Sequence, residues 1–277
     1  MKVAVYLSED PVHARCLNAF ATGVPKDVTL EVRPVTEYAT ADAAVVFGVF
    51  KKNVPVSWPR GEIMRRQKQA GGRTVVIDSG YVKRGMAPDS YYMVGFDGIN
   101  GWADFRNQGM PSDRWDALGI ELIPWRAHGE CVILCGQVPW DASVQALDML
   151  EWLPDTARAL RARTKRKIIY RPHPAARLHP PQVSGCETST RPLADDLAIA
   201  HCVVCYNSNS AVEAIISGVP AIVLGNGAMS EAVAERSLDN IERPRMPARE
   251  RWAHDLAYCQ WQPQEMAQGS AWRHLFR

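Results

Sequence analysis

Two stretches of the chain decide its fold: KIIYRPHP, residues 167–174, and CVVCYNSNSAVEAIISGVPAIVLG, residues 202–225. Short apolar runs at 168–170, 202–206 and 221–224 predict strands, and the pattern over 212–216 predicts a helix that ends at GVP. Strands that alternate with helices are typical of a parallel sheet covered on both faces. Ligands of such sheets bind beyond the carboxyl ends of the strands. Because RPHP, NSNS and GNG each follow a predicted strand, we expect them to converge on one site.

The composition is that of a globular protein with room for two domains. The chain has 277 residues, of which 47% are hydrophobic and 22% charged. It contains no apolar run of about 18 residues, and its start, MKVAVYLSED, lacks the features of a signal peptide. Seven cysteines are an odd number, and several lie inside predicted strands. We therefore expect reduced core thiols in a cytoplasmic protein without a membrane span.

The first half of the chain has the same alternating character. A strand at 2–7 is followed by Glu9, Asp10 and His13, and further strands are predicted at 28–32, 43–47 and 74–77. The last of these delivers Asp78 to the same sheet edge. Helices are predicted at 13–22 and 62–70, whereas 81–111 shows no clear element. We predict an N-terminal Rossmann-like domain over 1–128, a second over 129–262, and a C-terminal helix over 263–277 that can return to the first domain.

The RPHP loop has the character of a phosphate site. Two prolines fix the backbone on either side of His173, and Pro172 does the same for Arg171. A guanidinium and an imidazole held at a strand end suit phosphate oxygens. The alternative is an ordinary extended turn with a surface histidine.

A second anion site is predicted at Ser208, Asn209 and Ser210, where a strand turns into a helix with unpaired N–H groups. Simple N-capping by a serine is the alternative. Glu213 suits a capping box or hydrogen bonds to a ribose. Gly136 and Gln137 follow the strand predicted at 131–135, and the glycine allows a ligand to approach the backbone closely.

Several common motifs are missing from the sequence. It has no G-x-x-x-x-G-K-[ST] and no strand-linked G-x-G-x-x-G, which argues against an ATPase or a dinucleotide-binding enzyme. It has no H-E-x-x-H or paired CxxC for a metal, and no G-x-S-x-G of a hydrolase.

The net charge of +2 gives no strong field, but the basic residues gather in two runs. These runs fit solvated helix faces or the footprint of a polyanion such as DNA. They consist of Arg158, Arg161, Arg163, Lys165, Arg166 and Lys167, and of Lys51, Lys52, Arg60, Arg65, Arg66, Lys68 and Arg73.

Taken together, these motifs resemble those of a known class of proteins. YRPHP followed by ADDLAIAHCVVCYNSNSAVEAIISGVPAIVLG resembles the donor half of two-domain GT-B glycosyltransferases, in particular capsule-polysaccharide-type and sialyltransferase-like enzymes with an HP motif. VVIDSGY, GQVPWDASV and the small size also resemble GT-B proteins of tailed phages that modify DNA bases. The resemblance covers about residues 130–275 well and the first half loosely. It implies an α/β fold of two Rossmann-like domains whose parallel sheets face each other across a cleft.

The resemblance also implies a nucleotide-sugar donor, UDP- or CMP-linked, bound by the second domain without a metal. Arg171 and His173 would contact its phosphates together with Ser208, Asn209 and Ser210. Glu213 would face the nucleoside, and Gly136 and Gln137 would border the sugar, as the last members of the predicted donor set.

The acceptor would lie on the first domain, where a base must deprotonate its hydroxyl if the reaction inverts. Asp10 and Asp78 are the candidates, with Glu9 beside them, although each also suits a capping role in its loop. The phage-like features and the basic runs favour a hydroxymethylated base of double-stranded DNA, in the cytoplasm of the host cell. A saccharide acceptor is the alternative, and a non-catalytic nucleotide- or nucleic-acid-binding protein is the third hypothesis.

Overall fold

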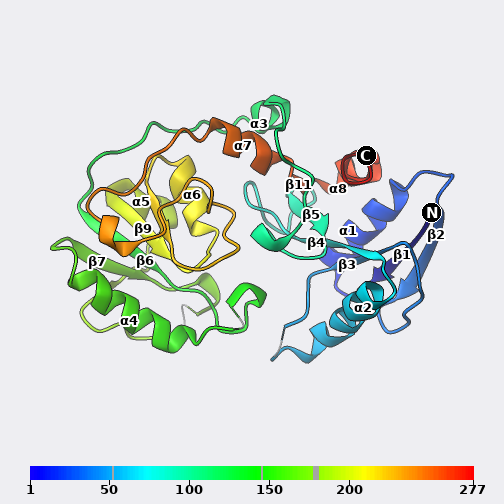
Figure 1. The fold of residues 1–277 in the computed structure, drawn as a ribbon, viewed down its shortest axis with the longest axis horizontal. Helices are drawn as coiled ribbons and strands as arrows, with labels where there is room; N and C mark the ends of the chain where they lie inside the picture. The colour runs from blue at the N-terminus through cyan, green and yellow to red at the C-terminus, as the bar shows by residue number, and fades with distance from the viewer. Residues whose placement is uncertain (52, 145, 177–180) are drawn as a thin grey trace. The chain divides into compact units, whose positions relative to one another are not determined.

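The computed structural model describes residues 1–51, 53–144, 146–176 and 181–277, and they form two compact units. The first unit comprises Met1–Ala117 and Ala253–Arg277, and the second comprises Leu118–Trp252. Each unit is built on its own sheet (Figure 1). The chain therefore leaves the first unit once and returns to it at its C-terminal end.

The sheet of the first unit has the order β11-β5-β4-β3-β1-β2. Four strands are mutually parallel: β1 (Lys2–Leu7), β2 (Thr29–Pro34), β3 (Ala43–Phe47) and β4 (Arg73–Ser79). At one side β5 (Tyr92–Phe96) pairs antiparallel with β4, and β11 (Gln260–Trp261) pairs antiparallel with β5. The predicted parallel strands are thus confirmed within a few residues, whereas β5 lies in the segment where the sequence showed no element.

Helices cover both faces of this sheet (Figure 1). One face carries α1 (Pro11–Thr22), α8 (Pro263–Ala267) and α9 (Ser270–Leu275), which share a core with the strands through Phe20, Met266 and Trp272. On the other face α2 (Trp58–Gln69) contacts β3 and β4. Two further helices are α3 (Asp113–Leu118) and α7 (Glu250–Ala257). The single helix predicted over 263–277 is wrong in one respect, since Gly269 at φ 77° separates α8 from α9.

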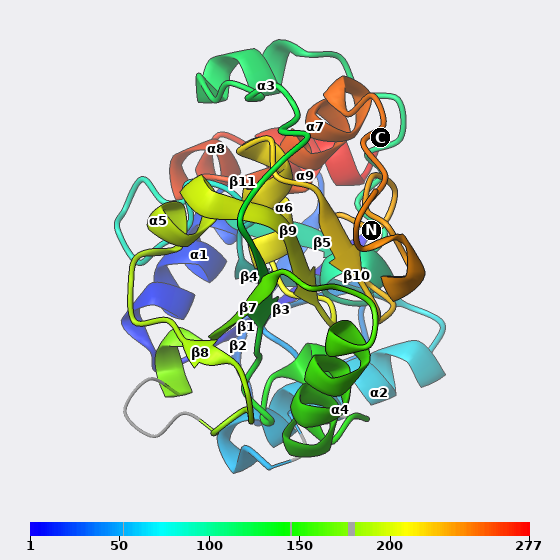
Figure 2. The same ribbon diagram turned by 90° about the vertical axis from the view of Figure 1, so that its left-hand side faces the viewer.

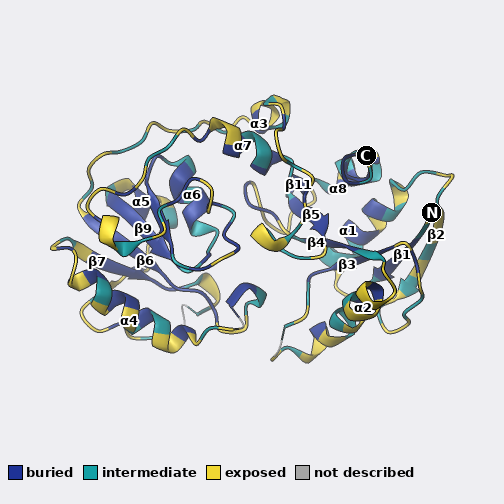
Figure 3. Cartoon of the chain, viewed as in Figure 1, coloured by how far each residue is buried: buried dark blue, intermediate teal, exposed yellow. Residues whose placement is uncertain are grey.

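The second unit has a wholly parallel sheet of the order β10-β9-β6-β7-β8. Its strands are β6 (Cys131–Cys135), β7 (Lys167–Arg171), β8 (Glu187–Thr188), β9 (Ala200–Cys205) and β10 (Ala221–Val223). Every residue of β6, β9 and β10 is buried, as expected of strands covered on both faces (Figure 3). The parallel arrangement predicted for 167–224 is confirmed.

Three helices flank this sheet: α4 (Met149–Arg161) on one face, and α5 (Leu193–Ile199) and α6 (Ser210–Ile216) on the other (Figures 1 and 2). Pro154 lies inside α4. One helix runs through that proline, because the side chain of Asp148 caps its start and the apolar face of Met149, Leu153 and Ala157 packs on the sheet.

The seven cysteines are unpaired thiols, and six of them are buried. In the part of the chain that the structure describes, no helix combines the length and apolar character needed to span a bilayer.

Candidate functional site

The loops after β6, β7 and β9 lie together at one edge of the second unit's sheet. The three strands are parallel neighbours in the order β9, β6, β7, so their carboxyl ends share that edge. Neighbouring strands are about 4.8 Å apart, which places the ends of β7 and β9 roughly 10 Å from each other. The RPHP loop, Gly136-Gln137 and the NSNS stretch are thereby brought together at the edge where parallel sheets bind ligands.

A buried pair of amides ties these loops to one another. Gln137 Nε2 donates to Asn207 Oδ1 at 2.9 Å, and the Asn207 backbone N–H donates to Gln137 Oε1 at 3.1 Å. Asn207 Nδ2 also donates to the carbonyl oxygens of Ser143 and Asn226 at 3.0 and 3.1 Å. Because buried amides are costly to leave unpaired, this network fixes the loops after β6, β9 and β10 relative to one another.

The serines of the NSNS stretch point their hydroxyls at each other. Ser208 Oγ lies 2.9 Å from Ser210 Oγ and accepts the Ser210 backbone N–H at 3.2 Å. Asn209 is the N-cap residue of α6, yet its side chain does not cap that helix and instead donates to Glu213 Oε1 at 3.3 Å. Glu213 thus contacts the side chain of the N-cap residue, and its capping or ribose-binding role stays a prediction. The side chains of Ser208, Asn209, Ser210 and Glu213 are all partly exposed at the sheet edge.

The local backbone sets the tautomer of His173. Its Nδ1 accepts the backbone N–H of Ala175 at 3.1 Å. A ring nitrogen that accepts a hydrogen bond carries no proton, so the neutral imidazole holds its proton on Nε2. His173 is half-buried, and in this neutral tautomer its ring N–H is on Nε2.

Arg171 has a different surrounding from the one that its sequence suggests. Its side chain is buried, and Nη1 donates to Asp196 Oδ2 at 2.8 Å and to the Arg191 carbonyl at 2.7 Å. Asp196 is fully buried and also accepts from Ser189 Oγ and from the Arg191 guanidinium. Arg171 thus neutralises a buried carboxylate and anchors the start of the RPHP loop.

Gly136 has a packing reason for being glycine. A Cβ atom there would lie 3.0 Å from the hydroxyl of Tyr170 and 3.5 Å from Leu153. The close approach that the sequence suggested is made by the protein's own side chains, and its use by a ligand stays a prediction.

A second group of polar side chains lies at the carboxyl edge of the first unit's sheet. Asp10 follows β1 and caps α1 by accepting the backbone N–H groups of Val12 and His13. Asp78 lies near the end of β4, and its Oδ2 is within 4 Å of the position that a Cβ on Gly48 would take. The Arg60 guanidinium lies at the same point and donates to the Phe47 carbonyl at 2.8 Å. Both predicted acids therefore lie at one edge, together with a cation that the sequence reasoning did not select.

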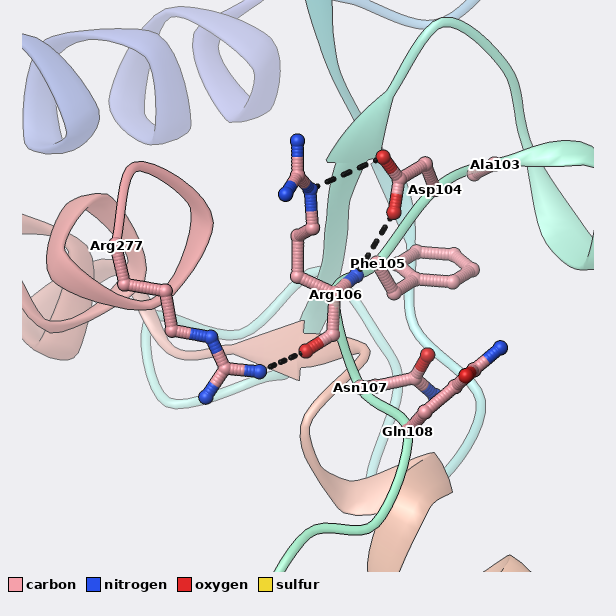
Figure 4. A pocket seen from close by; sticks show the side chains of 7 residues that line it. All are labelled: Ala103, Asp104, Phe105, Arg106, Asn107, Gln108 and Arg277. Carbon is pink, nitrogen blue, oxygen red and sulfur yellow. Dashed lines mark hydrogen bonds and ion pairs between the residues drawn. The ribbon is translucent and has the colours of Figure 1, made fainter.

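A hollow of about 610 Å³ in the first unit lies elsewhere (Figure 4). It is lined by residues 103–108 and Arg277, close to Phe96, which pairs with Val75 at the beginning of β4. This is the amino edge of the parallel strands, opposite to Asp10 and Asp78. The hollow therefore does not belong to the predicted site.

The first basic run is largely paired with carboxylates, and the second run is paired only in part. In the first run four cations have carboxylate partners: Arg158 with Asp155, Arg163 with Asp239, Arg166 with Glu242, and Lys167 with Glu187. In the second run Arg65 pairs with Glu62 and Arg73 with Asp97, whereas Lys52 lies outside the described residues. Among the described side chains, no three His, Cys, Asp or Glu residues gather as a metal site.

Sequence reasoning missed Asn207, Asp196 and Arg60 as parts of these two edges. Asn207 could have been selected, because it opens the polar stretch after a predicted strand. Asp196 and Arg60 lie in the middle of helical segments, where no local pattern distinguishes a buried charge from an exposed one.

Comparison with known proteins identifies the fold. The chain matches no family model and no curated protein. Among solved structures it is similar to the KpsC β-Kdo 2,7 transferase of Thermosulfurimonas dismutans, with 14% identity, a TM-score of 0.61 and 98% of each chain covered. It is also similar to the KpsC β-Kdo 2,4 transferase of that organism, with 15% identity, a TM-score of 0.58, and 87% of this chain and 89% of that chain covered. The predicted resemblance to capsule-type GT-B proteins, with two Rossmann-like α/β units, is thus confirmed at the level of the fold.

Proposed function

We propose that the chain is a nucleotide-sugar-dependent glycosyltransferase that transfers a sugar to a hydroxyl of a saccharide acceptor. The observation that carries the proposal is the convergence of the RPHP loop, Gln137 and the two serines at the carboxyl edge of one parallel sheet. The likeness of the fold to two β-Kdo transferases supports it and makes Kdo the first sugar to test.

In this proposal the second unit binds the donor, UDP- or CMP-linked. His173 donates from Nε2 to a phosphate oxygen, and the hydroxyls of Ser208 and Ser210 donate to the same phosphate. Arg171 positions the RPHP loop and does not contact the phosphate in this proposal, because its guanidinium is held by Asp196. Glu213 faces the nucleoside, Asn209 orients that carboxylate, and Gly136 and Gln137 border the sugar. The first unit handles the acceptor, with Asp10 and Asp78 at its carboxyl edge. These neutral donors serve in place of a metal, so EDTA should not abolish the activity.

The acceptor is proposed to be a saccharide rather than DNA because of the charges. Phosphate backbones are bound by unpaired Lys and Arg side chains. Four cations of the basic run around residue 160 instead form ion pairs with carboxylates. The observation that favoured a hydroxymethylated DNA base is weakened by these pairs, and DNA remains the second acceptor class to test.

The test is incubation with a panel of labelled UDP- and CMP-linked sugars, CMP-Kdo included. Nucleotide release and label transfer are measured with oligosaccharide acceptors and with hydroxymethylated duplex DNA at two salt concentrations. Transfer to an oligosaccharide supports the proposal, and transfer to DNA alone would replace the acceptor class. Neither hydrolysis nor transfer with any donor refutes the transferase and leaves the non-catalytic binding protein.

Variants connect the activity to the site. His173→Ala should weaken donor binding about tenfold, which corresponds to about 1.4 kcal/mol for one lost hydrogen bond. Ser208→Ala should act similarly, and Ser184→Ala, an exposed serine of the same unit, is the matched control. Equal donor affinity in all three variants would show that the nucleotide binds elsewhere.

A further inference from the structure

The carboxyl edge of the first unit holds an imidazole that has no assigned role. The ring of His13 stacks on Phe47, the last residue of β3, with 3.9 Å between the ring centroids and 17° between the planes. His13 lies in the first turn of α1, and about a quarter of its side chain is exposed (26%). Stacking holds the ring in one orientation while one edge of it stays accessible.

A serine on the preceding loop faces one nitrogen of this ring. Ser8 Oγ lies 3.2 Å from His13 Nδ1. If Nδ1 carries the proton and donates to Ser8, then Nε2 has the lone pair and can accept a proton. This is the arrangement in which a base is oriented by a third group.

Charged groups from three segments act on the same ring. Burial lowers the pKa of His13, Arg60 on α2 and Lys51 after β3 lower it further, and Asp10 partly offsets them. Asp10 Oδ1 lies 3.9 Å from Nε2, which is too far for a hydrogen bond yet close enough to stabilise an imidazolium once it forms. A neutral imidazole with a nearby carboxylate is suited to take up a proton at neutral pH.

Asp10 and Asp78, the two acids predicted as bases, are less suited than His13 to take a proton from the acceptor hydroxyl. Asp10 Oδ1 accepts the backbone N–H groups of His13 and Val12 at the start of α1. These hydrogen bonds, chiefly the one from His13, hold the pKa of this exposed carboxylate below its usual range. Asp78 accepts the backbone N–H of Ser79 at 2.7 Å and lies beside Arg60. A carboxylate held in its charged form is a weak base at neutral pH.

We propose that His13 is the general base for the acceptor hydroxyl, an assignment that rests on the proposed transferase function. Nε2 takes the proton of the hydroxyl as the acceptor oxygen forms its bond to the anomeric carbon. The bond between that carbon and the phosphate oxygen breaks, its electron pair leaves with the nucleotide, and His13 later returns the proton to water. Ser8 is a positioning residue that fixes the tautomer, and Asp10 stabilises the imidazolium.

The kinetic test compares His13→Gln with the wild type. A general base contributes about 10²- to 10⁴-fold, so the variant should lose that factor in kcat for transfer while donor affinity changes less than threefold. The acid limb of the wild-type pH–rate profile should disappear in the variant. His254→Gln, on α7, is the matched control and should keep both kcat and the acid limb. A His13→Gln variant with kcat within threefold of the wild type overturns the assignment even when transfer itself is confirmed.

A second test needs no substrate. Nitrogen-15 chemical shifts of the histidine rings report which nitrogen is protonated. Neutral His13 should show a protonated Nδ1, and Ser8→Ala should shift the population toward Nε2–H and lower kcat severalfold. A wild-type ring protonated on Nε2 cannot accept a proton there and overturns the proposal. If no donor is turned over at all, the transferase function fails and the base assignment fails with it, whatever the tautomer.

Discussion

Asp196→Ala should be among the most damaging single substitutions in the second unit. Asp196 is fully buried and holds Arg171 at 2.8 Å, Arg191 at 2.8 Å and Ser189 Oγ at 2.7 Å. Among the described residues, removal of the carboxylate leaves the buried guanidinium of Arg171 with only the carbonyl of Arg191 as a partner. Loss of one partner from a buried ion pair costs about 3–5 kcal/mol, because the remaining charge is left without compensation.

The control is an ion pair of similar length on the surface. Asp155 and Arg158 lie 2.9 Å apart with side chains that are mostly exposed. Asp155→Ala should cost less than about 1 kcal/mol, because water screens this pair. The free energy of unfolding is measured from urea titrations followed by circular dichroism, with the m-values compared so that a change in cooperativity is noticed. If Asp196→Ala costs no more than Asp155→Ala, the buried network does not hold the RPHP loop in place.

Three further substitutions test other features. Asn207→Ala should cost at least about 2 kcal/mol in urea unfolding, since it leaves several buried groups unpaired, whereas Asn18→Ala on an exposed face should cost under about 0.5 kcal/mol. Gly48→Ala should lower the free energy of unfolding by about 1 kcal/mol more than Gly71→Ala. Both glycines have positive φ, but only a Cβ at Gly48 would meet the Arg60 guanidinium, at 2.6 Å, so equal losses would contradict this reasoning. Burial lowers the pKa of His274 to about 4, so the unfolded chain binds more protons than the folded chain between pH 6.5 and 4. The free energy of unfolding should therefore fall by about 3 kcal/mol as the pH falls through this range, and His274→Gln should flatten that dependence in unfolding curves.

The parallel strands could be predicted because their signals are local. Runs such as Cys131–Cys135 are short, continuous and apolar, and the polar residues at their ends mark the functional edge. A parallel arrangement of these strands is enough to bring Gln137, His173 and Ser208 to one edge of the sheet.

Other features depend on contacts between distant segments. The strand β5 has only five residues and pairs antiparallel with β4 and β11, so its identity depends on a partner more than 160 residues away. The helix through Pro154 survives because Asp148 caps it and its apolar face is buried, and neither effect is visible in a proline read alone. The sequence predicts Arg171 as a phosphate ligand because nothing near it in the chain reveals its carboxylate partner, Asp196, which lies 25 residues further along.

The return of the chain to its first unit has a consequence for synthesis on the ribosome. Trp261, Met266 and Trp272 share a core cluster with Val3, Val5 and other residues of the first strands. A nascent chain that has been translated only to residue 252 therefore lacks side chains that cover one face of its earliest sheet. The contiguous second unit can close around its own core before the first unit is complete, because the first unit also needs residues 253–277 to leave the ribosome.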